Sequence, residues 1–263
     1  MEKEKPFFSI ITPFYNSERF INNYLEKLFL QTFNNWECIL IDDYSEDRSF
    51  DLVQRLSKKD KRIKIFKNKL NKKIKGHYQA RNFGLSLAKG AFICFLDIDD
   101  YWMDNMLAIK YKVLKENKNI DLIFTNYLKK NKKIEKKVSP IKIIPIKSQL
   151  NIHNPFGMLT TTVRRKLVIN KKFRSIIHED YVFWAELIRE NPNIKIKHLN
   201  KFLGTYFISK NSISSNKLLT FKWHYDCYIE LGYNNLIAII CFIPLLSIKF
   251  LIWLKSYMTK KHI

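Results

Sequence analysis

Apolar and amphipathic segments alternate through the first hundred residues of the chain. Apolar runs at residues 7–12, 36–41, 63–67 and 91–96 predict strands, and amphipathic stretches at 17–31, 48–58 and 77–88 predict helices. Strands separated by helix-length segments are typical of β-α-β units. We therefore expect an α/β fold, a mostly parallel sheet flanked by helices, with Gly90 as the C-terminal cap of the third helix.

Less regular elements follow residue 100. The pattern predicts a helix at 104–118, a strand at 121–126 and a helix at 179–190 that ends before Pro192. Residues 129–147 are rich in lysine and contain Pro140 and Pro145, which predicts a basic surface loop or a weak hairpin. We interpret residues 1–217 as one domain and residues 218–263 as a helical tail.

The tail is apolar from residue 236 to residue 254, apart from Ser247 and Lys249, and more lysines follow it. Nineteen residues can just span a bilayer, but Lys249 and Pro244 argue against a simple span. A helix lying in the membrane surface and a helix packed on the protein's own core are the alternatives. We favour contact with a membrane.

The amino-acid composition excludes few classes of protein. Apolar residues make up 46% of the chain, enough for a full-sized core. The formal net charge of +23 suggests an anionic partner, whether nucleic acid, an acidic membrane face or a phosphorylated substrate, although a solvated basic surface explains it equally well. Four widely spaced cysteines and an N-terminus without signal-peptide features favour a cytoplasmic location, at the inner face of the cell membrane.

The strongest chemical signal is the acidic run that follows the strand at 91–96. Asp97, Asp99 and Asp100 place three carboxylates within four positions, where like charges repel unless a cation neutralises them. Hard oxygen ligands favour Mg²⁺ or Mn²⁺. The alternative is an exposed acidic turn in which Asp100 caps the next helix.

Two further motifs lie near predicted strand ends. Asp42 and Asp43 end the second strand, where a carboxylate can accept a hydrogen bond from a nucleobase or ribose, or where the segment simply caps the next helix. Arg81 lies on the helix before the acidic strand and can reach a phosphate or nucleobase. Because ligands of open α/β sheets gather at the carboxyl ends of strands, these motifs mark the expected site.

Taken together, the motifs resemble the inverting family 2 glycosyltransferases, whose fold is the Rossmann-like GT-A domain. The resemblance rests on Thr-Pro-Phe-Tyr-Asn from residue 12, Asp-Asp-Tyr-Ser-Glu-Asp from 42, Ala-Arg-Asn-Phe-Gly from 80 and Leu-Asp-Ile-Asp-Asp-Tyr-Trp from 96. It extends from residue 7 to about residue 217. It is nearest to enzymes that build teichuronic acid, capsule and similar cell-surface polysaccharides.

The resemblance implies a role for each matching residue. It implies nucleotide binding by Pro13, Tyr15, Asp42, Asp43, Arg81 and Asp97, and metal binding by Asp99 together with Asp97. His-Glu-Asp-Tyr-Val-Phe-Trp from residue 178 is similar to the family's later acidic motif, in which Asp180 would be the catalytic base. Asp100, Glu179 and Lys210 are secondary candidates. An ordinary helix N-terminus rich in acids is the alternative for the 178–184 motif.

The implied reaction is metal-dependent transfer of a sugar from a nucleotide-sugar, most simply a UDP-sugar, to a polysaccharide or lipid-linked acceptor. Asp180 would remove a proton from the acceptor hydroxyl, and the metal would stabilise the departing diphosphate. One departure concerns the diphosphate contact, because Phe207 stands where many relatives have arginine. Lys210 would supply a positive charge nearby, although lysine lacks the bidentate fork of arginine.

Other classes of protein fit the sequence less well. A nucleic-acid-binding protein would explain the charge, but acids clustered at strand ends would repel DNA and we expect no nucleic-acid partner. A nucleotidyltransferase usually has a glycine-rich loop after its first strand, and residues 12–17 contain no glycine. A catalytically silent membrane adaptor on the same fold stays possible. The sequence does not reveal the sugar, the acceptor or the oligomeric state.

Overall fold

The computed structural model describes residues 5–69, 76–131, 135–142, 144–151, 153–208 and 217–240. Lys210 and most of the apolar segment at 236–254 therefore lie outside the described residues. The strands are β1 (Phe8–Phe14), β2 (Trp36–Asp42), β3 (Ile63–Lys67), β4 (Phe92–Phe95), β5 (Tyr101–Trp102), β6 (Leu122–Lys130), β7 (Glu135–Val138), β8 (Thr161–Arg164) and β9 (Ile196–Phe207). The α-helices are α1 (Glu18–Phe29), α2 (Ser49–Ser57), α3 (His77–Leu87), α4 (Met106–Glu116), α5 (Ile146–Gln149), α6 (Glu179–Glu190), α7 (Lys217–Glu230) and α8 (Asn235–Ile240), with short 3-10 helices at Met158–Thr160 and Arg165–Leu167.

The first half of the chain folds as its pattern predicts. Strands β3, β2, β1 and β4 pair in that order, all in parallel. Every residue of β1 and β2 is buried, because helices cover both faces of this part of the sheet. The chain therefore needs continuous apolar runs there rather than alternation.

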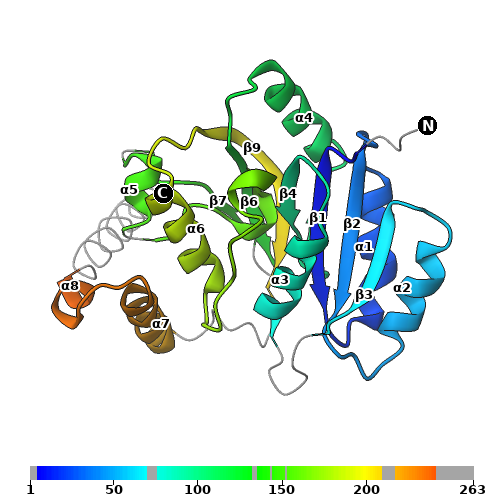
Figure 1. The fold of residues 1–263 in the computed structure, drawn as a ribbon, viewed down its shortest axis with the longest axis horizontal. Helices are drawn as coiled ribbons and strands as arrows, with labels where there is room; N and C mark the ends of the chain where they lie inside the picture. Colours follow the sequence, from blue (N-terminus) through cyan, green and yellow to red (C-terminus); the bar gives the residue numbers. More distant parts are fainter. Residues whose placement is uncertain are drawn as a thin grey trace, which may run out of the picture.

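Two helical layers enclose the sheet (Figure 1). On one face, α1 buries Ile21, Tyr24, Leu25 and Leu28, whose spacing is that of one helix face, in the same core as residues of α2 and α4. On the opposite face, α3 and α6 share a second core with the other side chains of β1 and β2. Successive residues along each strand point to opposite faces of the sheet, so they belong alternately to the two cores.

Close packing of α3 on β1 requires glycine at two places. A Cβ on Gly84 would lie 2.4 Å from Ile11 Cγ2, and one on Gly90 would lie 2.5 Å from the Ser9 backbone nitrogen. The prediction that Gly90 caps the third helix is wrong. The helix ends at Leu87, and Ala88 is its C-cap with extended backbone, so Gly90 serves close approach to β1 instead.

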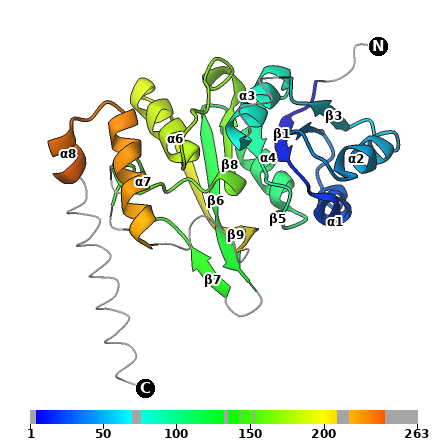
Figure 2. The same cartoon turned by 90° about the horizontal axis from the view of Figure 1, so that it is seen from below.

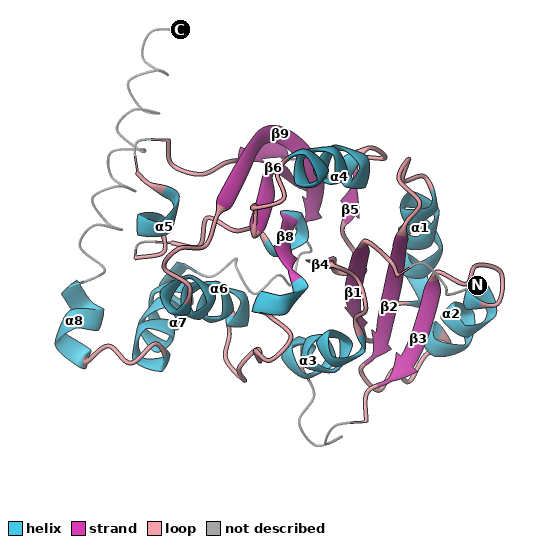
Figure 3. Ribbon diagram, turned by 45° about the horizontal axis from the view of Figure 1, so that its top comes forward, coloured by secondary structure: helices cyan, strands magenta, loops and turns pink. Residues whose placement is uncertain are grey.

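The second half corrects the prediction of a mostly parallel sheet. The sheet continues from β4 through β8, β6 and β9 to β5, and four of its pairings are antiparallel: β4 with β8, β6 with β8, β5 with β9 and β6 with β7. Among the described residues of this half, only β6 and β9 pair in parallel, with register shifts near Asn126. Figure 3 shows β1, β2 and β3 at one end of this mixed sheet and the longer β6 and β9 farther along it.

The helix predicted at residues 179–190 is α6, which ends before Pro192 as expected. The first part of the predicted basic loop or hairpin at 129–147 belongs to a hairpin of β6 and β7, and α5 begins at its end, at Ile146. Across the described ranges, no helix combines the length and apolar character needed to cross a bilayer. The apolar tail is described only as far as Ile240, at the end of α8.

Candidate active site

The three predicted motifs meet at one edge of the sheet. Phe14 lies opposite Asp42 in the β1–β2 ladder, and Ile11 lies opposite Phe95 in the β1–β4 ladder. The Leu96 backbone nitrogen continues the ladder by donating to the Ile11 carbonyl at 3.1 Å. The segments after β1, β2 and β4 therefore leave the sheet side by side, as the sequence predicted.

The acids after β2 stabilise their own loops. Asp42 Oδ1 accepts a hydrogen bond from the Ser45 backbone nitrogen at 3.1 Å. Asp43 accepts from Asn68 Nδ2 at 2.8 Å and from the Gly76 backbone nitrogen at 3.0 Å, so it joins the loop after β3 to the start of α3. Both carboxylates are buried. The pair thus holds the loops at the carboxyl end of β2 in place.

The loop after β1 turns sharply beside them. Asn16 has a φ of 45°, in the left-handed region that asparagine tolerates, and its Oδ1 accepts from the Glu46 backbone nitrogen at 2.8 Å. Pro13 is buried within β1, whereas Tyr15 is 40% exposed. Tyr15 therefore offers an aromatic face at this edge, next to the loop that follows Asp43.

The acids after β4 have three different environments. Burial acts to raise the Asp97 pKa, but the charges of Arg81 and His77 outweigh it and the pKa lies below its usual value. Burial, and then the charge of Asp97, raises the pKa of Asp99. Asp100 is 3% exposed and its pKa is raised well above the usual value, first by burial and then by the neighbouring aspartates.

Asp100 does not cap the following helix. Its Oδ1 accepts a hydrogen bond from the Phe207 backbone nitrogen at 3.0 Å, and the residue before α4 is Asn105. The alternative interpretation of the motif as an acidic turn capped by Asp100 is therefore wrong for that residue. Asp100 instead attaches the β4 loop to the end of β9.

This acidic run fits a divalent cation. The raised pKa values of Asp99 and Asp100 show that their charged forms are disfavoured by burial and by mutual repulsion, which a cation would relieve. Within the described residues, no three His, Cys, Asp or Glu side chains form a ready-made metal cage. Mg²⁺ and Mn²⁺ sites that rely on one or two carboxylates, water and substrate phosphates need no such cage.

Arg81 joins the acidic run to the later motif. Its side chain is 6% exposed, with Nη2 donating to Asp97 Oδ1 at 2.6 Å and Nη1 donating to Glu179 Oε1. Burial acts to lower the Arg81 pKa, but the charges of Asp97 and Glu179 outweigh it and the pKa is raised. The guanidinium of α3 thereby connects the end of β4 to the first turn of α6.

Replacing Arg81 with methionine is expected to destabilise the protein by about 3 kcal/mol, because Asp97 and Glu179 lose the cation that compensates their partly buried charges. Urea unfolding of Arg81→Met and wild type measures the difference. Arg48→Met is a matched control, because the Arg48–Glu18 ion pair is exposed and contributes little. Equal destabilisation in the two variants would contradict this account of Arg81.

Asp180 lies next to Glu179 in the first turn of α6. His178, the residue before the helix, has a φ of 63° and turns the chain sharply into the helix. Asp180 Oδ2 accepts from Asn154 Nδ2 at 2.9 Å, and Asn154 Oδ1 in turn accepts from the Phe156 backbone nitrogen at 3.0 Å. Burial, and then the charge of Glu179, raises the Asp180 pKa.

Four nearby residues were not among the predicted site residues. Asn154 contacts Asp180 directly, and Tyr127 is close enough for the charge of Asp180 to act on its pKa. The charges of His77 and Arg19 act on Asp99. The only sequence signal for Asn154 was the turn-forming Asn-Pro pair, and nothing in the sequence marked the other three.

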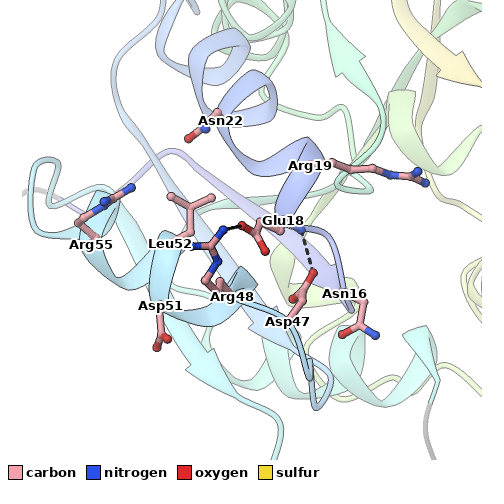
Figure 4. A pocket seen from close by; sticks show the side chains of 9 residues that line it. All are labelled: Asn16, Glu18, Arg19, Asn22, Asp47, Arg48, Asp51, Leu52 and Arg55. Atoms are coloured by element: carbon pink, nitrogen blue, oxygen red, sulfur yellow. Dashed lines mark hydrogen bonds and ion pairs between the residues drawn. The ribbon is translucent and has the colours of Figure 1, made fainter.

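A groove of about 880 Å³ lies beside this edge, between α1 and α2 (Figure 4). Glu18 and Arg48 pair within it at 2.9 Å, and the Glu18 backbone nitrogen donates to Asp47 Oδ2 at 3.2 Å. Arg19 extends away from the other side chains that line the groove (Figure 4). Asn16 links the groove to the loop after β1.

The mixed sheet and its acidic strand ends define an α/β protein of the GT-A type. The same fold occurs in the mannosyltransferase PcManGT from Pyrobaculum calidifontis, solved in complex with GDP-Man and Mn²⁺, with a TM-score of 0.66 and 14% identity over 88% of this chain and 66% of that one. The family model for glycosyl transferase family 2 matches residues 9–173. The chain belongs to this family and is a glycosyltransferase.

Two bacterial relatives are similar over most of their length. UDP-Glc:alpha-D-GlcNAc-diphosphoundecaprenol beta-1,3-glucosyltransferase WfgD of Escherichia coli is 35% identical over 233 residues, which are 88% of either chain. The putative teichuronic acid biosynthesis glycosyltransferase TuaG of Bacillus subtilis is 28% identical over 235 residues, 88% of this chain and 90% of its own. The resemblance to family 2 and to surface-polysaccharide enzymes is thus confirmed, and a nucleotidyltransferase is not favoured.

Proposed function

We propose that the protein is an inverting, metal-dependent glycosyltransferase that transfers a sugar from a UDP-sugar to a lipid-linked or polysaccharide acceptor. The main observation in support is that the Arg81 guanidinium contacts both Asp97 and Glu179. That contact brings the acids after β4 to the first turn of α6, which carries Asp180. This arrangement supports a proposed donor site and a proposed base that lie close together.

The nucleotide half of the donor is assigned to the ends of β1 and β2. Pro13 and Tyr15 would contact the base, with Tyr15 exposed for stacking, while the Asp42–Asp43 pair would hold the base or ribose through carboxylate oxygens. Asp97 would contact ribose, and Arg81 would orient it. The buried place of Arg81 favours this positioning role over direct contact with the nucleotide. Lys210, a candidate for the diphosphate, stays a prediction.

Asp99 is the proposed principal ligand for Mg²⁺ or Mn²⁺, with Asp97 beside it and Asp100 as a secondary candidate. When bound, the cation supplies Lewis-acid stabilisation of the charge on the departing nucleoside diphosphate. The protein's own contribution is to keep the Asp99 carboxylate partly buried beside Asp97. Its raised pKa marks a charge that lacks compensation in the protein alone.

Asp180 is the proposed general base. Asn154 donates to its Oδ2, and the carboxylate would accept the proton of an acceptor hydroxyl as that hydroxyl attacks the anomeric carbon from the face opposite the leaving group. The raised pKa strengthens the carboxylate as a base, because a higher pKa means a more favourable proton transfer. Glu179 would hold Arg81 rather than take part in proton transfer.

The acceptor and the membrane are proposed on other grounds. The name of WfgD specifies a diphosphoundecaprenol-linked acceptor, and that of TuaG specifies teichuronic acid biosynthesis, which supports a lipid-linked or polysaccharide acceptor here. Leu236, Ile239 and Ile240 on α8 are each at least half exposed, which supports contact of the C-terminal part with the inner face of the cell membrane. The division at residue 217 into a catalytic domain and a tail remains part of this proposal.

Thermal unfolding with UDP, GDP, CDP or dTDP, each with and without Mn²⁺, tests the donor site. A ligand that binds only the folded state raises the melting temperature. We expect a clear rise with UDP that requires Mn²⁺, and smaller shifts with the other three. A protein whose melting temperature responds to none of the eight conditions would favour a catalytically silent adaptor and would overturn the proposal.

A further inference from the structure

Two lysines lie opposite each other on the hairpin of β6 and β7. The register pairs Lys129 with Lys136 and Tyr127 with Val138, whereas Lys130 pairs with Glu135. Directly opposed residues of an antiparallel ladder share a face, and successive residues alternate between faces. Lys129 and Lys136 therefore lie on the same face as Tyr127. Two like charges in such a pair destabilise the hairpin unless an anion compensates them.

The two faces of the hairpin differ in how their charges are compensated. On the other face, Lys130 Nζ pairs with Glu135 at 3.3 Å, and Lys137 lies 5.6 Å from the centre of the Phe202 ring. Glu135 is the only acid among the described residues of β6 and β7. On the Tyr127 face no described strand residue of the hairpin supplies a negative charge to the lysine pair.

The neighbouring strand extends the lysine face. Lys129 lies opposite Tyr206 of β9, and its Nζ lies 5.2 Å from the centre of that ring. Burial, and then the charge of Lys136, lowers the pKa of the Lys129 ammonium. The Lys129 ammonium thus lies over an aromatic ring and near a second cation, and it is only partly exposed to solvent.

The same face leads to the proposed base. Tyr127 is packed against Gly157, where an added Cβ would lie 2.7 Å from Tyr127 Cε1. Asn154, three residues before Gly157, donates to Asp180 Oδ2 at 2.9 Å, so this loop contacts both Tyr127 and Asp180. Burial, and then the charge of Asp180, raises the pKa of Tyr127 to about 12. Lys129 follows two residues later, about 7 Å farther along β6. Figure 2 shows β7 and the end of β6 projecting from the rest of the molecule.

We propose that Lys129 and Lys136 form an anion subsite that binds the phosphate of a phosphate-bearing acceptor, with Tyr127 between this subsite and Asp180. The inference rests on the proposed function and adds the residues that would hold the phosphate of its acceptor. Two ammonium groups provide six donors on flexible stems, which suits the tetrahedral oxygens of a phosphate. The bound anion also relieves the repulsion between the lysines. A phosphate held by the two lysines would leave the first sugar on the side of Tyr127, toward Asp180.

The test compares two double variants of the same hairpin. Lys129→Gln with Lys136→Gln removes the pair, and Lys130→Gln with Lys137→Gln removes the same charge from the opposite face. The probe is octyl diphosphate below its micelle concentration, with octyl glucoside as the uncharged comparison, and dissociation constants come from calorimetric titration at fixed salt. We expect the first variant to weaken octyl diphosphate binding at least tenfold and the second to change it less than twofold. Equal weakening in both variants would show a diffuse basic surface, and no weakening in either would mean that the phosphate binds away from the hairpin. Either result would overturn the subsite.

A second experiment distinguishes binding of an acceptor phosphate from binding of a lipid headgroup. Binding to vesicles of phosphatidylcholine with and without phosphatidylglycerol is measured by sedimentation for the same proteins. We expect both double variants to lose vesicle binding to a similar extent, since attraction to an anionic surface depends on charge rather than on face. Loss of vesicle binding only in the Lys129 and Lys136 variant, with octyl diphosphate binding unchanged, would assign the pair to headgroups and overturn the proposal.

The Mn²⁺-dependent melting shift with UDP is measured on the same variants. An unchanged shift together with lost octyl diphosphate binding supports the subsite in an intact donor site. If the wild-type protein shows no nucleotide shift but still binds octyl diphosphate through the lysine pair, the proposed transferase function fails while the anion subsite stands.

Discussion

Asp180→Asn is expected to lower kcat by about a thousandfold while leaving nucleotide binding within twofold of wild type. General-base catalysis typically contributes a factor of 10² to 10⁴, and an amide cannot accept the proton of the acceptor hydroxyl. The substitution keeps the oxygen that accepts from Asn154, so the local geometry is retained. The measurement is sugar transfer with saturating donor and acceptor, alongside the UDP-dependent melting shift.

The stability of the same variant separates a catalytic role from a structural one. The Asp180 pKa is raised in the folded protein, so the folded state binds a proton more tightly than the unfolded state. Ionisation therefore costs stability at neutral pH, and this cost disappears as the pH falls below the folded pKa. Asp180→Asn should melt at neutral pH no lower than wild type. A large fall in melting temperature would mean that Asp180 is chiefly structural.

The pH dependence of wild type follows from the same shift. The base must be ionised, so kcat/KM should fall as the pH drops through the raised Asp180 pKa, above the range of an ordinary aspartate. The residual activity of Asp180→Asn should lack this limb. Glu190→Gln, on the last turn of the same helix, is the matched control because its carboxylate is exposed and paired with Lys171. A thousandfold loss in Glu190→Gln, or full activity in Asp180→Asn, would exclude the assignment of the base.

Asp99→Asn is expected to abolish the Mn²⁺-dependent part of UDP binding and to reduce transfer at least a hundredfold. An amide carries no negative charge to hold the cation. Removing one group that stabilises developing charge in a transition state typically costs about 10² to 10³ in rate. The burial and the nearby Asp97 that raise the Asp99 pKa make its charge unfavourable in the metal-free protein. The variant should therefore be at least as stable as wild type without Mn²⁺.

Asp104→Asn is the matched control for this substitution. Asp104 lies five residues farther along, is exposed and precedes α4. Titration of the melting shift with Mn²⁺ at fixed UDP compares the two variants and wild type. If Asp99→Asn keeps the Mn²⁺ dependence of wild type, or if Asp104→Asn loses it, the cation is held elsewhere and Asp99 is not its ligand.

The first four strands and three helices could be predicted because their signals are local. Continuous apolar runs identify β1 and β2, and the spacing of Ile21, Tyr24, Leu25 and Leu28 identifies the buried face of α1. Each βαβ unit then has one favoured handedness, so the parallel order of these strands follows from their succession along the chain. The acids after β2 and β4 were predicted at one edge for the same reason.

The second half could not be predicted in this way. β5 has two residues and β8 has four, which is too short for a periodic signal, and β9 mixes polar with apolar residues because it is only partly buried. The antiparallel pairing of β8 with β4 and β6, and of β5 with β9, depends on which edges are available once the first half has folded. The prediction of a mostly parallel sheet extended the pattern of the first hundred residues into a region that lacks it.

The sequence by itself determined the glycosyltransferase family, the parallel core and the identity of the candidate acids, because these depend on residue types at short spacings. Only the tertiary structure decided that Arg81 contacts Glu179 across 98 positions of sequence, that Asn154 contacts Asp180, and that Lys129 faces Lys136 on the side of Tyr127. Contacts of this kind depend on strand register and on how helices pack over the sheet. A shift of one residue in the β6–β7 register would place Glu135 or Lys137 opposite Lys129 and move Lys136 to the other face, and no local pattern specifies that choice.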